Sequence, residues 1–152
     1  MAKILIVDDE ADMRTVLFHA LRGAGHSVTE AAGGEEALKK IKRTKFDLVL
    51  LDIMMPAMSG YEVLEKIREM PSRRTTPVVV VTAKHDPHGV QREVAAAVTD
   101  HIAKPFLPSE LEDVVRRALK STQKAVDKRR GELKRSAEVY GALGELRKNV
   151  ED

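Results

Sequence analysis

The chain has 152 residues, of which 43% are hydrophobic, 33% charged and 3% aromatic, and this length suits one domain with a short appendage. It contains no Cys, which excludes disulfides, thiolate nucleophiles and cysteine-ligated metal clusters. Acidic and basic side chains balance over residues 1–120, so we expect no specific nucleic-acid binding. The apolar runs are too short to span a membrane and the N-terminus is not a secretion signal, so we expect a soluble cytoplasmic protein.

The first half of the chain alternates short apolar runs, typical of buried strands, with segments of helical period. In chain order, the predicted elements are a strand over 3–7, a helix over 11–24, a strand over 27–31, a helix opened by Gly33 and Gly34, and a strand over 47–51 that ends at Asp52. The apolar stripe of the first helix includes Val16, Leu17 and Leu21, and Gly25 is expected to end that helix.

The second half repeats the same alternation after a loop that contains Pro56 and Gly60. Its predicted elements are a helix carrying Val63, Leu64 and Ile67, a strand over 78–82, a weaker helix over 90–98, a strand over 101–103 and a helix over 109–121. Ser109 and Glu112 have the spacing of a capping box, which marks the start of the last helix.

The predicted strands are uniformly apolar rather than alternating, which indicates a parallel sheet buried on both faces and therefore a doubly wound α/β domain. We expect residues 1–120 to form this domain and residues 121–152 to form a helical tail. The tail is too short for an independent output domain. Its apolar stripe could pack on the domain, pair with a second copy or dock on a partner.

Polar side chains stand at or just after the predicted strand ends, at Asp8, Asp9, Asp52, Thr82 and Lys104. Ligands of doubly wound sheets bind outside the carboxyl ends of the strands. Crowded carboxylates repel one another unless a cation lies among them, and all-oxygen ligands suit Mg²⁺. A lysine and a hydroxyl suit phosphoryl oxygens, and a carboxylate can itself accept a phosphoryl group. Any one Asp alone is more simply a helix N-cap, but the whole set favours phosphoryl chemistry on an aspartate.

Four motifs in this order carry a family resemblance that covers residues 3 to about 120. They are Ile6-Val7-Asp8-Asp9-Glu10, Leu50-Leu51-Asp52-Ile53-Met54-Met55-Pro56 with Gly60, Val81-Thr82-Ala83, and Lys104-Pro105-Phe106. The chain resembles the response-regulator receiver domain, the phosphoacceptor of two-component signalling. The resemblance implies a flavodoxin-like fold with strand order 2-1-3-4-5 and five helices.

The resemblance also implies a role for each matching acidic residue. Asp52 would accept the phosphoryl group of a sensor histidine kinase or a phosphotransfer protein. Asp9, Asp52 and the backbone carbonyl of Met54 would bind Mg²⁺, and Asp8 would act largely through a bound water. The protein would be a phosphoprotein that carries an aspartyl phosphate.

The remaining site residues follow from the last two motifs. Lys104 would pair with phosphoryl oxygens, Thr82 would swing its hydroxyl toward them, and the small Ala83 would leave access for the phosphodonor. The Lys104–Pro105 bond is expected to be cis. His101 stands where the family usually has a Tyr or Phe that turns inward on phosphorylation. It is either a half-packed histidine without a switching role or a smaller switch whose protonation near neutral pH couples output to acidity.

Together these features predict a stand-alone response regulator rather than an enzyme, whose phosphorylation changes a protein-binding surface on the fourth helix, fifth strand and fifth helix. Homodimerisation on phosphorylation is one outcome that the pattern allows. A phosphorylation-independent scaffold with the same fold is the alternative. A phosphohydrolase is disfavoured because Met54 stands where those enzymes carry a second Asp.

Overall fold

The computed structural model describes residues 1–83 and 98–121. All but the last residue of the predicted helix over 90–98, and residues 122–152 of the predicted tail, lie outside the described residues. The compact unit Met1–Leu119 holds both the sheet and the predicted site, and it is described by itself.

The unit is built on one five-stranded sheet whose strand order is β2-β1-β3-β4-β5. Its strands are β1 (Lys3–Val7), β2 (Ser27–Ala31), β3 (Leu48–Asp52), β4 (Val78–Ala83) and β5 (Asp100–Lys104). All neighbouring strands pair in parallel, so their carboxyl ends meet at one edge of the sheet. The predicted flavodoxin-like fold and its strand order are therefore confirmed.

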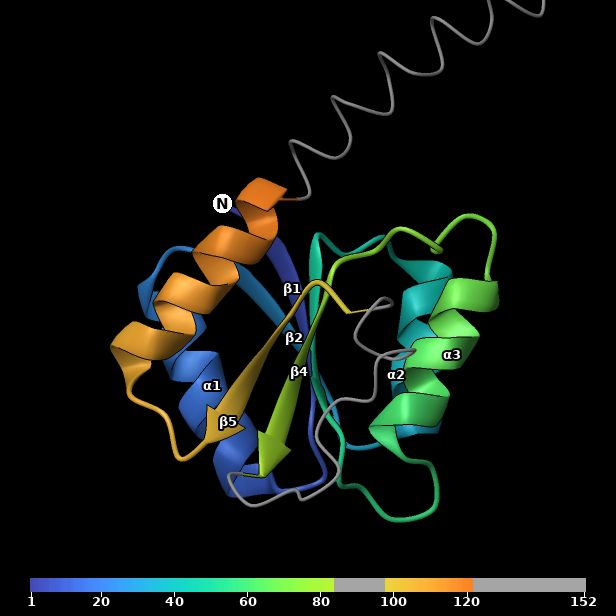
Figure 1. The fold of residues 1–152 in the computed structure, drawn as a ribbon, viewed down its shortest axis with the longest axis horizontal. Coiled ribbons are helices and arrows are strands. Elements are labelled where there is room, and N and C mark those ends of the chain that lie inside the picture. The colour runs from blue at the N-terminus through green and yellow to red at the C-terminus, as the bar shows by residue number, and fades with distance from the viewer. Residues whose placement is uncertain (84–97, 122–152) are drawn as a thin grey trace, which may run out of the picture. The chain divides into compact units, whose positions relative to one another are not determined.

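Helices cover both faces of this sheet (Figure 1). They are α1 (Ala11–Gly23), α2 (Gly34–Arg43), α3 (Gly60–Glu69) and a helix over residues 108–121. The first and last of them pack on one face, and α2 and α3 pack on the other. Four of the five predicted helices are thus present in the described residues.

The central strands send alternate side chains into two separate hydrophobic cores. In β1, Leu5 and Val7 face α2 and α3, whereas Ile4 and Ile6 face α1 and the last helix. Both sets are buried, which explains why the pattern of β1 is uniformly apolar. The edge strand β5 differs, because a strand with only one neighbour keeps part of its length in solvent.

Several predicted boundaries move by a residue. β3 and β5 extend to Asp52 and Lys104, so both polar residues occupy the last position of a strand. The last helix begins at residue 108, where the Leu107 carbonyl accepts the N–H groups of Glu110 and Leu111. The predicted start at Ser109 is therefore one residue late, since Pro108 fits the first helical position.

Val16 belongs to the apolar stripe predicted for the first helix, but it is 57% exposed and so does not contribute to the core. The apolar arc of α1 is wider than its contact with the sheet. Leu17 and Leu21 lie at the centre of that contact and are fully buried, whereas Val16 lies about 100° around the helix from Leu17.

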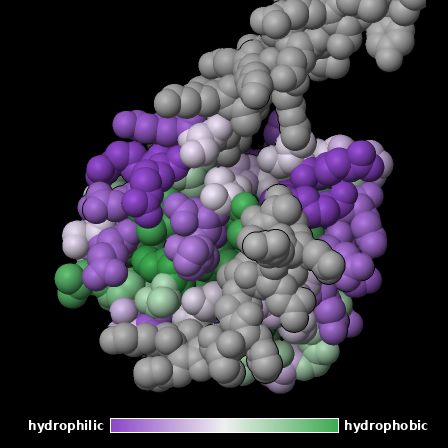
Figure 2. All heavy atoms as spheres, viewed as in Figure 1, coloured by the Kyte–Doolittle hydropathy of each residue, from purple (hydrophilic) through white to green (hydrophobic). Residues whose placement is uncertain are grey.

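Figure 2 shows hydrophilic side chains over the outward faces of the helices on either side of the sheet. This distribution is typical of helices that bury one stripe and expose the other. Among the described residues, no helix combines the length and apolar character that membrane crossing requires.

The turn after α1 offers a matched pair of glycine substitutions. Gly25 has a φ of 92°, Gly23 is the last residue of α1, and an added Cβ at either position would meet nothing within 4 Å. We expect Gly25→Ala to lower the free energy of unfolding by about 1–2 kcal/mol because of its left-handed backbone. Gly23→Ala should be neutral or stabilising by up to about 1 kcal/mol. Urea unfolding measures both, and equal effects would contradict a backbone origin.

Candidate functional site

The site lies at the carboxyl edge of the sheet, where the parallel strands end side by side. Asp8 follows β1 directly, Asp52 is the last residue of β3, and Lys104 is the last residue of β5. The pairing of β4 with β5 sets Ala83 opposite Lys104 and Thr82 opposite Ala103. Strand order rather than sequence distance therefore brings the predicted site residues together.

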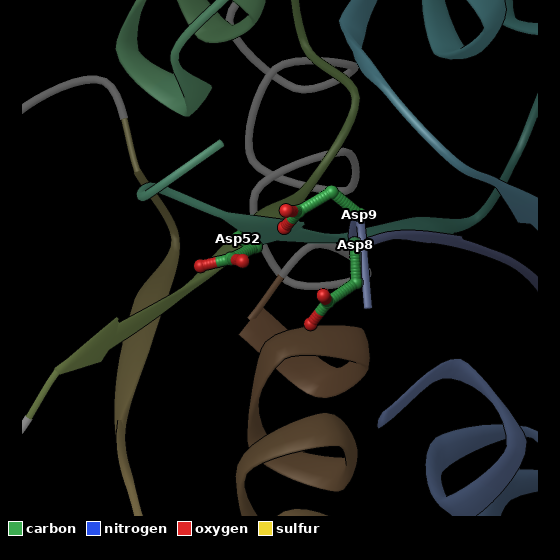
Figure 3. A group of neighbouring side chains, drawn as sticks. All are labelled: Asp8, Asp9 and Asp52. Atoms are coloured by element: carbon green, nitrogen blue, oxygen red, sulfur yellow. The ribbon is translucent and has the colours of Figure 1, made fainter. Parts of the chain in front are cut away.

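Asp8, Asp9 and Asp52 form a cluster that we call the acidic triad. One carboxylate oxygen of each lies within 4.8 Å of those of the other two. Figure 3 shows the side chains of Asp8 and Asp9 reaching from the end of β1 toward the side where Asp52 lies. Asp8 and Asp52 are only 1% and 5% exposed, whereas Asp9 is exposed. The triad thus has a buried floor and an open side.

Lys104 neutralises part of this charge. Lys104 Nζ lies 3.3 Å from Asp8 Oδ2 and 3.7 Å from Asp52 Oδ2. Backbone groups complete the support: the N–H of Glu10 donates to Asp8 Oδ1 at 2.9 Å, and the N–H of Met54 donates to Asp52 Oδ1 at 3.2 Å. The other oxygen of each buried carboxylate is the one nearest the lysine.

The electrostatic cost of this arrangement appears at Asp52. Burial raises the pKa of its carboxyl group from 3.8 to about 6, and the charges of Asp8 and Asp9 add to the rise. Lys104 and the Met54 N–H act in the opposite direction without cancelling it. A cluster of oxygen ligands with excess negative charge and one open side is the donor set that Mg²⁺ prefers. The residues present therefore fit the cation that the sequence predicts.

The remaining predicted residues lie on β4, on β5 and directly after β5. The Thr82 hydroxyl is largely buried and donates to the Ile102 carbonyl over a long 3.5 Å, so little holds it in place. His101 is exposed on β5, and its backbone N–H donates to Asp100 Oδ1 at 2.8 Å. The Lys104–Pro105 peptide bond is cis.

The loop between β3 and α3 folds back on the end of β3, and this contact requires glycine. A Cβ on Gly60 would lie 2.3 Å from the Asp52 carbonyl oxygen, closer than any side chain allows. The Gly60 N–H donates to the Ile53 carbonyl at 3.0 Å and secures the contact. Gly60 belongs to the second sequence motif, but only the structure shows its steric role.

Ala57, in the same loop, has a φ of 66°, which is uncommon for a residue with a side chain.

One residue at the site was not predicted from the sequence. The guanidinium of Arg14, on the first turns of α1, donates to the backbone carbonyl of Asp8 at 2.7 Å. Because Arg14 binds a backbone carbonyl and pairs with Glu30, the excess of acids at the strand ends gave no signal for it. No periodicity distinguishes Arg14 from the other polar residues of α1 either.

Comparison with known proteins gives a consistent result. The family model described as "Response regulator receiver domain" matches residues 4–116. The transcriptional regulatory protein ResD of Bacillus subtilis is 40% identical over 109 residues, which are 72% of this chain and 44% of ResD. The chain spans about half the length of the curated relatives that it matches first.

Solved structures extend the likeness to three dimensions. A putative response regulator from Chloroflexus aurantiacus is 36% identical with a TM-score of 0.74, and the match covers 78% of this chain and 98% of that chain. The chemotaxis protein CheY4 of Vibrio cholerae is 36% identical with a TM-score of 0.72, with the same coverage of 78% and 98%. At 36% sequence identity, both matches indicate more than a shared fold.

Replacing Asp52 by Asn should stabilise the metal-free protein at neutral pH. The pKa of Asp52 is raised from 3.8 to about 6, so the folded state keeps a proton that the unfolded state releases in this range. The free energy of unfolding therefore falls as pH rises from about 4 to about 6. In EDTA at pH 7, Asp52→Asn should raise the free energy of unfolding by about 1–3 kcal/mol, and this gain should vanish near pH 4. Urea unfolding at both pH values measures it.

The matched control removes the same charge from an exposed site. Asp113 is 62% exposed and pairs only with Arg116 among the described residues. Asp113→Asn should change the free energy of unfolding by no more than about 0.5 kcal/mol. An equal gain for Asp52→Asn at pH 4 and pH 7 would contradict an electrostatic origin.

Proposed function

The chain belongs to the response regulator receiver domain family, as its four motifs predicted, and on this premise we propose that Asp52 accepts a phosphoryl group in a magnesium-dependent reaction. The observation that carries this proposal is the position of Asp52. Its carboxylate lies at the end of β3, nearly buried, beside two further carboxylates and 3.7 Å from Lys104. No structural need explains so much unbalanced charge at one edge of the sheet.

The chemistry requires an ionised carboxylate and charge neutralisation. Asp52 attacks the phosphorus of a phosphohistidine on a kinase or phosphotransfer protein. The new P–O bond gives an acyl phosphate, and the P–N bond breaks as the histidine leaves with a proton. Lys104 meets the phosphoryl oxygens. The acidic triad and the backbone carbonyl of Met54 would hold Mg²⁺, which supplies positive charge to the oxygens in transfer. With a pKa of about 6, Asp52 is ionised at pH 7 in the absence of the cation as well.

The switch that we propose begins at Thr82. Its hydroxyl is held to the Ile102 carbonyl only at 3.5 Å, so a phosphoryl group on Asp52 would compete for it effectively. Movement of this hydroxyl would act on β5, which is an edge strand of the sheet. His101 lies exposed on that strand and would report the change to a protein partner. The phosphoryl group thus biases two states of one surface.

The output of the whole protein remains a separate proposal. The relatives include transcriptional regulators, and this chain spans about half their length. A stand-alone regulator that acts through protein contacts, with dimerisation on phosphorylation as one form of output, stays the prediction from the sequence. A nucleic-acid-binding output, like that named for MtrA of Mycolicibacterium paratuberculosis, is the competing outcome.

Phosphorylation of Asp52 can be tested with a small donor. Incubation with acetyl phosphate and Mg²⁺ should add one phosphoryl group, read by intact mass, because the donor needs no partner protein. EDTA or Asp52→Asn should abolish the gain. Asp47→Asn, a control at an exposed Asp near the opposite end of β3, should leave it unchanged. A wild-type protein that gains no mass would favour the phosphorylation-independent scaffold.

The lifetime of the acyl phosphate should depend on Met54. This residue is 70% exposed two positions after Asp52, where its apolar side chain cannot orient an attacking water. We expect slow loss of the phosphoryl group, and Met54→Asn should speed the loss several-fold by supplying an amide. The decay of the phosphorylated mass after donor removal measures this. Met54→Leu is the matched apolar control, and faster decay in that variant would contradict the explanation.

A further inference from the structure

The turn between β1 and α1 carries two of the three triad residues but lacks the usual support of a helix start. Glu10 occupies the N-cap of α1, and its side chain makes no capping hydrogen bond. Within this turn, the Asp8 carboxylate supports the backbone by accepting the Glu10 N–H at 2.9 Å, whereas Glu10 itself gives no cap. The direction of Asp9 therefore needs another constraint.

Asp9 is also the triad member with the least side-chain support. Asp8 accepts from the Glu10 N–H and pairs with Lys104, and Asp52 accepts from the Met54 N–H. Within residues 1–83 and 98–121, no hydrogen bond or ion pair involves the Asp9 carboxylate. Within these residues, its direction therefore depends on its backbone rather than on side-chain partners.

Arg14 holds that backbone. Its guanidinium donates to the Asp8 carbonyl at 2.7 Å, while its own N–H donates to the Glu10 carbonyl at 3.1 Å. The Asp8 N–H is already bound to the Ala31 carbonyl at 3.2 Å. Because the peptide unit is planar, a fixed Asp8 carbonyl also fixes the amide N–H and the Cα of Asp9. This leaves rotation about the N–Cα bond and the side-chain torsions as the remaining freedom of its carboxylate.

The guanidinium is itself held from a second strand. Arg14 Nε lies 3.5 Å from Glu30 Oε1 on β2, and the Arg14 side chain is only 18% exposed. Lys40 of α2 donates to the Glu30 carbonyl and pairs with Glu36 at 3.0 Å. A planar guanidinium that is fixed from two sides loses little conformational freedom for each hydrogen bond that it makes. The ammonium group of a lysine cannot reproduce this geometry.

We propose that Arg14 is a positioning residue for the divalent cation, which it serves by fixing the Asp8–Asp9 peptide and so the direction of the Asp9 carboxylate. The inference rests on the proposed magnesium-dependent function. Arg14 contributes no ligand atom. Its loss leaves all three carboxylates in place but misdirects the exposed one, and loss of such outer contacts costs about 10–100-fold in metal affinity.

The test compares Arg14→Met, Arg14→Lys and the control Arg22→Met in the full chain. Arg22 lies on the same helix, stacks over the Phe18 ring at 5.6 Å and is remote from the triad. Titration calorimetry with Mg²⁺ gives the dissociation constant. We expect it to rise about 10–100-fold in Arg14→Met, to rise less in Arg14→Lys, and to stay unchanged in Arg22→Met.

Two further measurements separate positioning from general damage. Urea unfolding in EDTA reports the fold, and the rate of phosphorylation by acetyl phosphate is followed against Mg²⁺ concentration. A positioning role shifts the Mg²⁺ dependence to higher concentration, while the rate at saturating Mg²⁺ returns to within about twofold of wild type. A rate that stays low at saturating Mg²⁺ would overturn the proposal.

The outcomes distinguish this inference from the proposed function. Mg²⁺ binding that is unchanged in folded Arg14→Met overturns the role of Arg14 and leaves the function intact. Wild-type protein that neither binds Mg²⁺ nor gains a phosphoryl group overturns the function. If Arg14→Met does not fold, Arg14→Lys and Glu30→Gln decide the matter. Wild-type affinity in both variants overturns the proposal, and weaker binding in both supports it.

Discussion

The repulsion among the three carboxylates of the acidic triad is the constraint on which the rest of the site depends. Asp8 and Asp52 are almost fully buried, and within residues 1–83 and 98–121 only Lys104 pairs with them. Burial, with the charges of Asp8 and Asp9 added to it, raises the pKa of Asp52 in spite of the attraction of Lys104. A parallel sheet makes this concentration possible, because it brings the ends of β1, β3 and β5 to one edge and supplies a rigid core beneath them.

Backbone contacts, more than side-chain contacts, hold the triad in shape. Gly60 lets the loop after β3 close against the Asp52 carbonyl, and Arg14 holds the Asp8 carbonyl on the other side of the site. The loop also reaches α2, where a Cβ on Gly34 would lie 2.7 Å from Met58 Sδ. The backbone that carries Asp8 and Asp52 is therefore held by contacts that extend to both helical layers.

Much of the fold followed from local pattern. The boundaries of β1 and β2 agree with the predicted strands, and Gly25 follows α1 with the left-handed φ that a helix end favours. The errors arise where burial depends on partners. Val16 has the right period for the core but lies beyond the edge of the contact between α1 and the sheet. The exposed residues of β5 result from its position at an edge of the sheet. The sequence of a single strand indicates this position only weakly.

For the site, the sequence by itself determined which residue types stand at the strand ends, because each apolar strand and the polar residue that ends it are neighbours in the sequence. It also carried the family motifs. Only the tertiary structure decided that Asp9 depends on its backbone, that Gly60 touches the Asp52 carbonyl and that Arg14 holds the Asp8 peptide. These are contacts between segments whose meeting depends on how helices and loops pack against the sheet. Packing is a property of the whole chain, so no short segment of sequence specifies it.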